Sequence, residues 1–146
     1  MFLGINPSVA SLLQPDVITV ESGSTVSEVA RVMAQKNVRN VFVLSKGQPH
    51  GLIRDWDIIR RVVALNLNPD VVKVDDVMYT PVASVQADAE LSEIAAIMAE
   101  TGVRRVLVMQ EERILGTITA GSLLSIVSHF PTSTLQETLR SIAGLT

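Results

Sequence analysis

The sequence predicts an α/β (α+β) protein in which two tandem β-α-β-β-α repeats pack sheet to sheet about a pseudo-twofold axis, followed by a C-terminal helix. Three observations predict this fold. The chain aligns with itself without gaps at an offset of about 65 residues. Segments with helical apolar spacing alternate with short, Val-rich segments that are typical of strands. A single repeat is too small to cover both faces of its sheet, so two copies are expected to cover each other.

The internal repeat includes several residue types and is not a match of valines alone. The aligned pairs include Ser27 with Ser92, Glu28 with Glu93, Met33 with Met98, Arg39 with Arg104, and Gly51 with Gly116. Chance would not align this mixture at one offset. The chain is therefore divided into repeat 1 with an N-terminal lead-in (residues 1–66), a linker (67–73), repeat 2 (74–130) and a C-terminal helix (131–146).

Each repeat is expected to open with an apolar lead-in, a short strand and a helix. The first strands are predicted at residues 17–20 and 82–85. Ser24 and Ser92 stand near the expected helix starts, in a pattern typical of a capping box. Both helices keep one apolar face at helical spacing, formed by Val26, Val29, Ala30 and Met33 in repeat 1 and by Leu91, Ile94, Ala95 and Met98 in repeat 2.

Asn37 and Gly102 are expected to end these helices, because both residues tolerate the left-handed conformation of a helix C-terminus. Two strands joined by a turn and a last helix then complete each repeat. The strands are predicted at residues 40–44, 51–54, 105–109 and 114–119, and the last helices at about 57–65 and 122–128. Beyond Pro131, a Ser-Thr start and an apolar stripe predict the C-terminal helix.

The overall composition excludes several classes of protein. The net charge of −3 and the isoelectric point near 5.3 lack the basic excess of a nucleic-acid-binding protein, so no nucleic-acid partner is expected. The chain contains no cysteine, which excludes disulfides and thiolate zinc sites and fits a cytoplasmic location. No apolar run approaches the roughly 18 residues of a membrane span, so no membrane partner is expected.

Three motifs resemble those of tandem CBS-domain pairs, also called Bateman modules. They are Val74 to Val82 (VDDVMYTPV), Gly102 to Val108 (GVRRVLV) with its copy at Asn37 to Val43, and Gly51 to Asp57 (GLIRDWD) with its copy at Gly116 to Ser122 (GTITAGS). The motifs are duplicated in the same order as the predicted elements. The resemblance extends from about Val9 to Phe130.

This resemblance implies two clefts that bind adenosine-type nucleotides. In the family, a Thr or Ser of the third motif bonds phosphate, an Asp three residues later accepts from ribose hydroxyls, and the first strand of the opposite repeat holds the base. One implied cleft contains Arg54, Asp57, Val82, Ala83 and Ser84, and the other contains Thr119, Ser122, Val17, Ile18 and Thr19. Arg39, Arg104 and Arg105 stand at the starts of second strands, where the family often places phosphate contacts.

Both copies of the third motif depart from the family pattern. Arg54 replaces the hydroxyl residue, and Ser122 replaces the acid. A guanidinium at position 54 favours a highly charged ligand such as ADP or ATP. Ser122 offers ribose only a weaker contact, so the cleft of Asp57 ranks first.

Structural interpretations of the same residues stay open. Asp57 and Ser122 could simply cap the helices that follow them. Arg39 and Arg104 could be surface charges or could pair with Glu28 and Glu93.

The resemblance implies a stand-alone regulatory module that binds AMP, ADP, ATP or S-adenosylmethionine as a regulatory ligand, with no other cofactor, and signals to an unidentified protein effector. A homodimer formed through the apolar last helices is expected. The alternative is a dimerising scaffold with degenerate clefts. No phosphate-binding glycine loop or nucleophile elbow occurs, so no enzyme is predicted. His50 and His129 have no second metal ligand at useful spacing, so no metal site is predicted.

Overall fold

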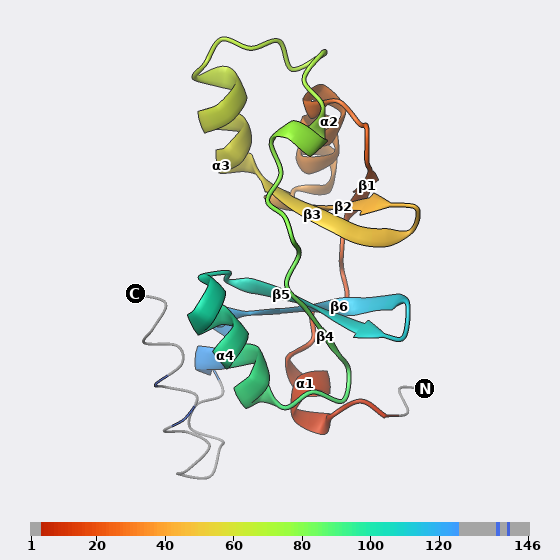
Figure 1. Cartoon of the computed structure of the whole chain (residues 1–146), viewed down its shortest axis with the longest axis vertical. Coiled ribbons are helices and arrows are strands. Elements are labelled where there is room, and N and C mark those ends of the chain that lie inside the picture. The colour runs from red at the N-terminus through yellow and green to blue at the C-terminus, as the bar shows by residue number, and fades with distance from the viewer. Residues whose placement is uncertain (1–3, 126–136, 138–139, 141–146) are drawn as a thin grey trace. The chain divides into compact units, whose positions relative to one another are not determined.

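A computed structural model describes residues 4–125 together with residues 137 and 140 (Figure 1). Apart from residues 137 and 140, the segment 131–146 of the predicted C-terminal helix lies outside the described residues. The predicted fold class is confirmed, with two three-stranded sheets and helices in a duplicated order. The elements are α1 (Pro7–Leu12), β1 (Thr19–Glu21), α2 (Val26–Lys36), β2 (Asn40–Ser45), β3 (Gln48–Arg54), α3 (Asp55–Ile58), the π-helical turn η1 (Ile59–Val63), the 3-10 turn η2 (Val74–Asp76), β4 (Ser84–Gln86), α4 (Leu91–Thr101), β5 (Arg105–Gln110), β6 (Arg113–Thr119) and α5 (Ala120–Ser125).

The two sheets share one topology and one register. In each, a short first strand pairs in parallel with the second strand, which pairs antiparallel with the third. Thr19 pairs with Phe42 in one sheet, and Ser84 pairs with Leu107 in the other, which are equivalent positions of the repeat. Even the register irregularity recurs, after Val43 in β2 and after Val108 in β5. The duplication therefore extends from the sequence to the hydrogen-bond pattern.

The compact units of the chain are not the same segments as the two repeats. The central unit is Val17–Val82, and the split unit combines the residues up to Asp16 with those from Ala83 onward. Each lead-in thus belongs to the sheet of the other repeat, as Figure 1 shows for α1 beside the β4-β5-β6 sheet and for the segment after η2 beside β3.

Backbone hydrogen bonds and glycines fix this exchange of lead-ins. Gln14 forms two 2.9 Å backbone hydrogen bonds with Thr117 of β6, and Tyr79 forms the equivalent pair with Leu52 of β3 at 2.8 and 3.0 Å. A Cβ atom at Gly116 would lie 2.4 Å from the carbonyl oxygen of Gln14. Glycine at this position therefore permits the close backbone approach.

Each unit has its own aliphatic core, in which both helices cover one face of the sheet. In the central unit, the core joins α2, β2, β3, α3 and η1 to Val74, Val77 and Met78 of the second lead-in. In the split unit, Val9 and Leu12 of α1 complete the equivalent core. Of the apolar helix positions predicted from the sequence, all but one are buried in these cores: Val26, Val29, Met33, Leu91, Ile94, Ala95 and Met98. Ala30 is only partly buried and packs against the core of the central unit.

The helix C-termini agree with the prediction, whereas the N-terminal caps differ. Asn37 and Gly102 adopt left-handed φ values of 55° and 77°. Thr25, and not Ser24, caps α2, because its hydroxyl accepts from the Glu28 N–H while the Glu28 carboxylate accepts from the Thr25 N–H. The prediction of Ser92 as a cap was also wrong: α4 begins at Leu91, so Ser92 already lies inside the helix.

Candidate functional site

Each unit carries a polar pair where its third strand passes into its last helix. In the central unit, Arg54 precedes α3 and Asp57 is its third residue. In the split unit, Thr119 precedes α5 and Ser122 is its third residue. The four residues are therefore equivalent in pairs, and each pair closes the first turn of its helix by hydrogen bonds between its two members.

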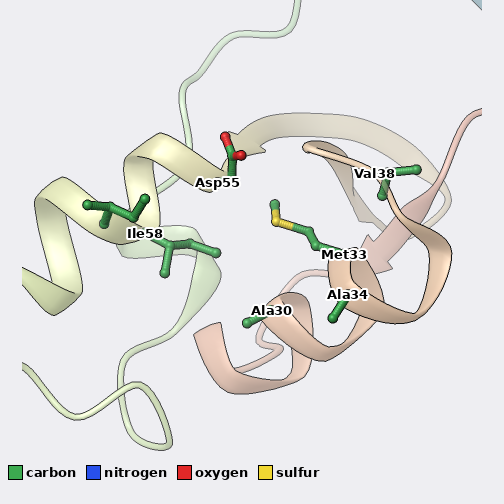
Figure 2. Close-up of a pocket in the computed structure, with 7 residues that line it drawn as sticks. Ala30, Met33, Ala34, Val38, Asp55 and Ile58 are labelled. Atoms are coloured by element: carbon green, nitrogen blue, oxygen red, sulfur yellow. The ribbon is translucent and has the colours of Figure 1, made fainter.

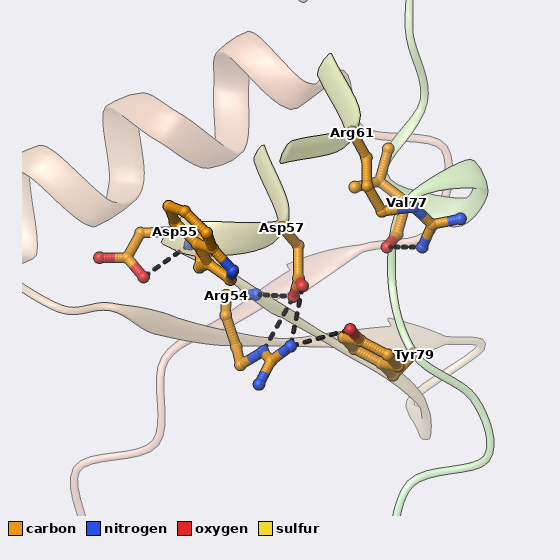
Figure 3. A network of polar contacts seen from close by, with 7 residues as sticks. Arg54, Asp55, Asp57, Arg61, Val77 and Tyr79 are labelled. Atoms are coloured by element: carbon orange, nitrogen blue, oxygen red, sulfur yellow. Dashed lines mark hydrogen bonds and ion pairs between the residues drawn. The ribbon is translucent and has the colours of Figure 1, made fainter. Parts of the chain in front are cut away.

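The Asp57 carboxylate is fully engaged by Arg54 (Figure 3). Oδ2 accepts from the Arg54 backbone N–H at 2.9 Å and from Nε at 3.1 Å, and Oδ1 accepts from Nη2 at 3.0 Å. Only 1% of Asp57 is exposed. A buried carboxylate requires such partners. Asp57 does not cap a helix that follows it, as one interpretation proposed, because it is the third residue of α3; its carboxylate accepts from the Arg54 N–H that precedes the helix and is also half of an ion pair.

The Arg54 guanidinium also contacts Tyr79, which follows η2 in the second lead-in. Nη2 donates to the Tyr79 hydroxyl at 2.8 Å, and Cζ lies 4.7 Å from the centroid of the ring. The hydrogen bond to Asp57 raises the pKa of Arg54 above its ordinary value, against the opposite effect of partial burial. Arg54 is therefore a permanent cation, and 42% of its side chain is still exposed.

Arg39, for which the sequence left open a surface charge or a pair with Glu28, lies close to this pair in the fold and has Asp55 as its partner. Its Nε is 3.9 Å from Oδ2 of Asp55, and both side chains are exposed. Glu28, the partner suggested by the sequence, instead completes the cap of α2. An exposed pair at this distance contributes little to stability, so Arg39 remains available as a surface cation.

The equivalent pair in the split unit consists of two neutral hydroxyls. The Thr119 and Ser122 hydroxyl oxygens lie 2.7 Å apart. Thr119 Oγ1 accepts from the Ser122 N–H at 3.1 Å, and Ser122 Oγ accepts from the Thr119 N–H at 3.2 Å. Thr119 therefore occupies the cap position before α5, whereas Ser122, which one interpretation of the sequence proposed as the cap, is the third residue of the helix. Both residues stay partly exposed, unlike Asp57.

Arg105, at the start of β5, is the half-buried cation of the split unit. Its Nη1 donates to the Thr117 hydroxyl at 3.0 Å, and burial lowers its pKa. In the part of the chain that the structure describes, no carboxylate forms an ion pair with it. The arrangement suits an anion beside β5 and β6. Arg104 next to it is exposed, and its carbonyl accepts from the Ala120 N–H at 2.9 Å.

Sequence reasoning missed Thr117 and Tyr79. Thr117 is 3% exposed and lies two residues before Thr119, so strand alternation places both side chains on one face of β6. The alternation of side chains along this strand was the feature of the sequence that could have identified Thr117. Tyr79 had no such signal, because its role depends on the exchange of lead-ins.

The predicted base-binding segments are divided between the two units. Val82 belongs to the central unit, whereas Ala83 and Ser84 belong to the split unit. Val17, Ile18 and Thr19 belong to the central unit, whereas Thr119 and Ser122 belong to the split unit. Thr19 and Ser84 are exposed, and the other four are partly buried. Their assembly with the polar pairs into two clefts stays a prediction.

An apolar groove lies between α2 and α3 of the central unit (Figure 2). Its volume is about 340 Å³. The lining residues are Ala30, Met33, Ala34, Val38, Asp55, Ile58 and Ile59. Exposed apolar side chains continue along α3 and η1, where Trp56, Ile59 and Val63 are 54%, 47% and 61% exposed. By contrast, Ile58 and Val62 are buried and belong to the core.

Two further features bear on the class of protein. Within residues 4–125, 137 and 140, no helix is long and apolar enough to cross a membrane. Among the same residues, no three His, Asp or Glu side chains come together as a set of metal ligands.

Comparison with known proteins agrees with the duplicated fold. The family model described as CBS domain matches residues 9–64 and 74–129. An uncharacterized protein of Methanopyrus kandleri is 29% identical over 135 residues, covering 91% of this chain and 68% of that protein. A hexameric CBS-CP12 protein from bloom-forming cyanobacteria has a TM-score of 0.72 at 24% identity, covering 90% of this chain and 84% of that one. The cytosolic domain of the Mg²⁺ channel MgtE, solved in complex with ATP, has a TM-score of 0.66 at 24% identity, covering 79% of this chain and 46% of that one.

Proposed function

The chain belongs to the CBS domain family, and from this premise we propose that it is a regulatory module that binds an adenine nucleotide. Tandem CBS-domain proteins are generally regulatory and often bind nucleotides. We propose Asp57 as the acceptor for the ribose hydroxyls and Arg54 as a contact for phosphate. We further propose that the module acts in the cytoplasm and that a partner protein reads the ligand-bound state.

The observation that supports this proposal most directly is the polar pair at the same position of both units. Arg54 with Asp57 and Thr119 with Ser122 stand where the family's phosphate and ribose contacts are expected. Each pair has arginines at the start of the neighbouring strand, Arg39 in one unit and Arg104 and Arg105 in the other. Arginine, hydroxyl and carboxylate groups together match the phosphate and the vicinal hydroxyls of a nucleotide.

Isothermal titration of the whole chain with AMP, ADP, ATP and S-adenosylmethionine tests the proposal. We expect at least one of them to bind, and Asp57→Ala to weaken that binding by at least about tenfold, as removal of a hydrogen bond to a charged group does. Asp76→Ala, which removes an exposed carboxylate from the same unit, is the matched control and should bind as the wild type does.

Thermal unfolding provides a second measurement that does not depend on the heat of binding. A ligand at about 100 times its dissociation constant adds about 2.7 kcal/mol to the free energy of unfolding. No heat and no thermal shift with any of the four ligands in the wild type would refute the proposal. Equal binding by Asp57→Ala and the wild type would refute the role of Asp57.

A dimerising scaffold is the second candidate function, and the groove between α2 and α3 favours it. The groove and the exposed Trp56, Ile59 and Val63 form a continuous apolar surface of a kind that interfaces cover. This function would need no ligand. A dimer in sedimentation velocity, together with silence in both ligand assays, would favour the scaffold over the nucleotide module.

A further inference from the structure

The Asp57 carboxylate, on which the proposed function depends, already has a partner in this structure. Its two oxygens accept three hydrogen bonds from Arg54. Because only 1% of Asp57 is exposed, no ribose hydroxyl can reach the carboxylate while the guanidinium stays in place. A nucleotide can use Asp57 only after Arg54 has moved.

Tyr79 is a second partner of the guanidinium, through the same Nη2 that donates to Asp57 (Figure 3). The hydroxyl accepts from Nη2 at 2.8 Å, and the ring lies 4.7 Å from Cζ, within the range of a cation–π contact. The Tyr79 backbone is itself fixed by two hydrogen bonds to Leu52 of β3. Release of Arg54 therefore breaks contacts to both Asp57 and Tyr79.

The cost of this release depends on what the ligand offers in return. Moving Arg54 leaves a buried carboxylate without its cation, which is strongly unfavourable. Ribose hydroxyls restore only part of the lost stabilisation of the carboxylate, because they are neutral hydrogen-bond donors. A phosphate chain also gives the guanidinium a new anionic partner with charge-assisted, bidentate hydrogen bonds. Arg54 is 42% exposed, so its side chain has solvent into which it can turn.

We propose that Arg54, held by Asp57 and Tyr79, is a latch that makes this position select adenosine ligands with a phosphate chain over adenosine ligands without one. The inference rests on the proposed function and narrows its ligand class to nucleotides such as ADP and ATP. It ranks uncharged nucleosides and S-adenosylmethionine as weaker ligands of the resting protein than ADP and ATP.

The split unit shows the same backbone arrangement without the latch. Thr119 stands at the position of Arg54, Ser122 at that of Asp57, and Gln14 at that of Tyr79. The turn therefore accepts a threonine at the position before the helix. Arg54→Thr removes the latch and introduces a residue that the equivalent turn already contains.

The test compares ATP with adenosine by isothermal titration against the wild type, Arg54→Thr and Tyr79→Phe. In the wild type, we expect ATP to bind about 10- to 100-fold more tightly than adenosine, the range expected for a hydrogen bond to a charged group. Arg54→Thr should weaken the binding of ATP and strengthen the binding of adenosine, so that the ratio of their two dissociation constants comes close to one. Arg60→Thr removes the same charge from an exposed residue of η1 and should keep the wild-type ratio.

Tyr79→Phe tests the latch without removing the buried ion pair, so it does not depend on the stability of Arg54→Thr. Loss of the hydroxyl should loosen Arg54 and raise the affinity for ATP by a few-fold, because one hydrogen bond fewer is broken on release. Inorganic tripolyphosphate, as a third ligand, tests whether the phosphate chain alone accounts for the binding.

The outcomes separate the latch from the proposed function. Equal affinity for ATP and adenosine in the wild type, or a ratio unchanged in Arg54→Thr, would overturn the latch and leave nucleotide binding intact. Tripolyphosphate binding as tight as ATP would overturn the assignment to a nucleotide. No binding of any adenine compound to the wild type or to Arg54→Thr would overturn both proposals.

Discussion

Substituting three glycines by alanine tests whether each exchanged lead-in is packed against the third strand of the sheet that it joins. A Cβ at Gly116 would lie 2.4 Å from the Gln14 carbonyl oxygen and 2.9 Å from its carbonyl carbon, both backbone atoms. At Gly51, the nearest atom would be the Met78 sulfur at 2.3 Å, and the Tyr79 carbonyl oxygen would lie 3.0 Å away. At Gly121, nothing lies closer than the Thr119 hydroxyl at 3.8 Å.

These distances predict an order of effects on the free energy of unfolding. Gly116→Ala must displace the lead-in and break its two backbone hydrogen bonds to Thr117, which costs about 2–4 kcal/mol. Gly51→Ala costs less, about 1–2 kcal/mol, because a flexible methionine side chain can move aside. Gly121→Ala lies in α5, where alanine has the better helix propensity, and stabilises the chain by about 0.5–1 kcal/mol.

Urea unfolding of the three variants and the wild type, followed by circular dichroism, measures this order. Gly121→Ala is the matched control, because it makes the same substitution five residues from Gly116. A free energy of unfolding for Gly116→Ala within about 0.5 kcal/mol of the wild type would refute the reasoning, since a surface substitution without a clash has an effect of that size. The lead-in would then not be packed on β6 as described.

Further predictions concern pH, a helix cap and self-association. Partial burial raises the pKa of Asp75, but hydrogen bonds from the Ser22 hydroxyl and the Gly23 N–H outweigh burial and hold the pKa below its ordinary value of 3.8. Asp75 therefore stabilises the fold above pH 3.8 and loses that contribution as the pH falls through its folded pKa; Asp75→Asn should flatten the acid limb of thermal unfolding. Thr25→Ala should cost about 1 kcal/mol in urea unfolding, and Ser24→Ala clearly less. If copies associate through the apolar groove, Ile59→Lys should yield monomers in sedimentation velocity; an unchanged sedimentation coefficient would exclude this surface.

Much of the fold could be predicted from local patterns. The strands, the helices and the left-handed residues Asn37 and Gly102 each follow from periodicity and backbone preference within a few neighbouring residues. The offset between the repeats then predicted that both units would contain the same elements in the same order, which the structure confirms. These features depend on residues that are close together in the sequence, so they can be predicted without knowledge of the tertiary packing.

The exchange of lead-ins could not be predicted from the same patterns. Val9 and Val74 are equivalent in sequence, so either could complete the core of either repeat without any change in apolar pattern. The choice depends on packing between segments that are far apart along the chain. The contact of Arg54 with Tyr79 follows from that choice and was missed for the same reason.

The site was predicted in part. Asp57 and Arg54 were identified as the principal pair, but each was assigned to a ligand, whereas the structure joins them to each other. Their spacing of three residues at a helix start already suggests a pair between side chains. Thr117 and Arg105 show the opposite case, since only the strand register brings the two together.

Because the lead-ins are exchanged, each three-stranded sheet is completed by a segment that precedes the other repeat in the sequence. A polypeptide limited to residues 17–66 would lack the second lead-in, which packs against its sheet. A second polypeptide would have to supply that segment. A single repeat with its own lead-in could reach the same packing by exchanging that lead-in with a second identical chain, as in a domain-swapped dimer.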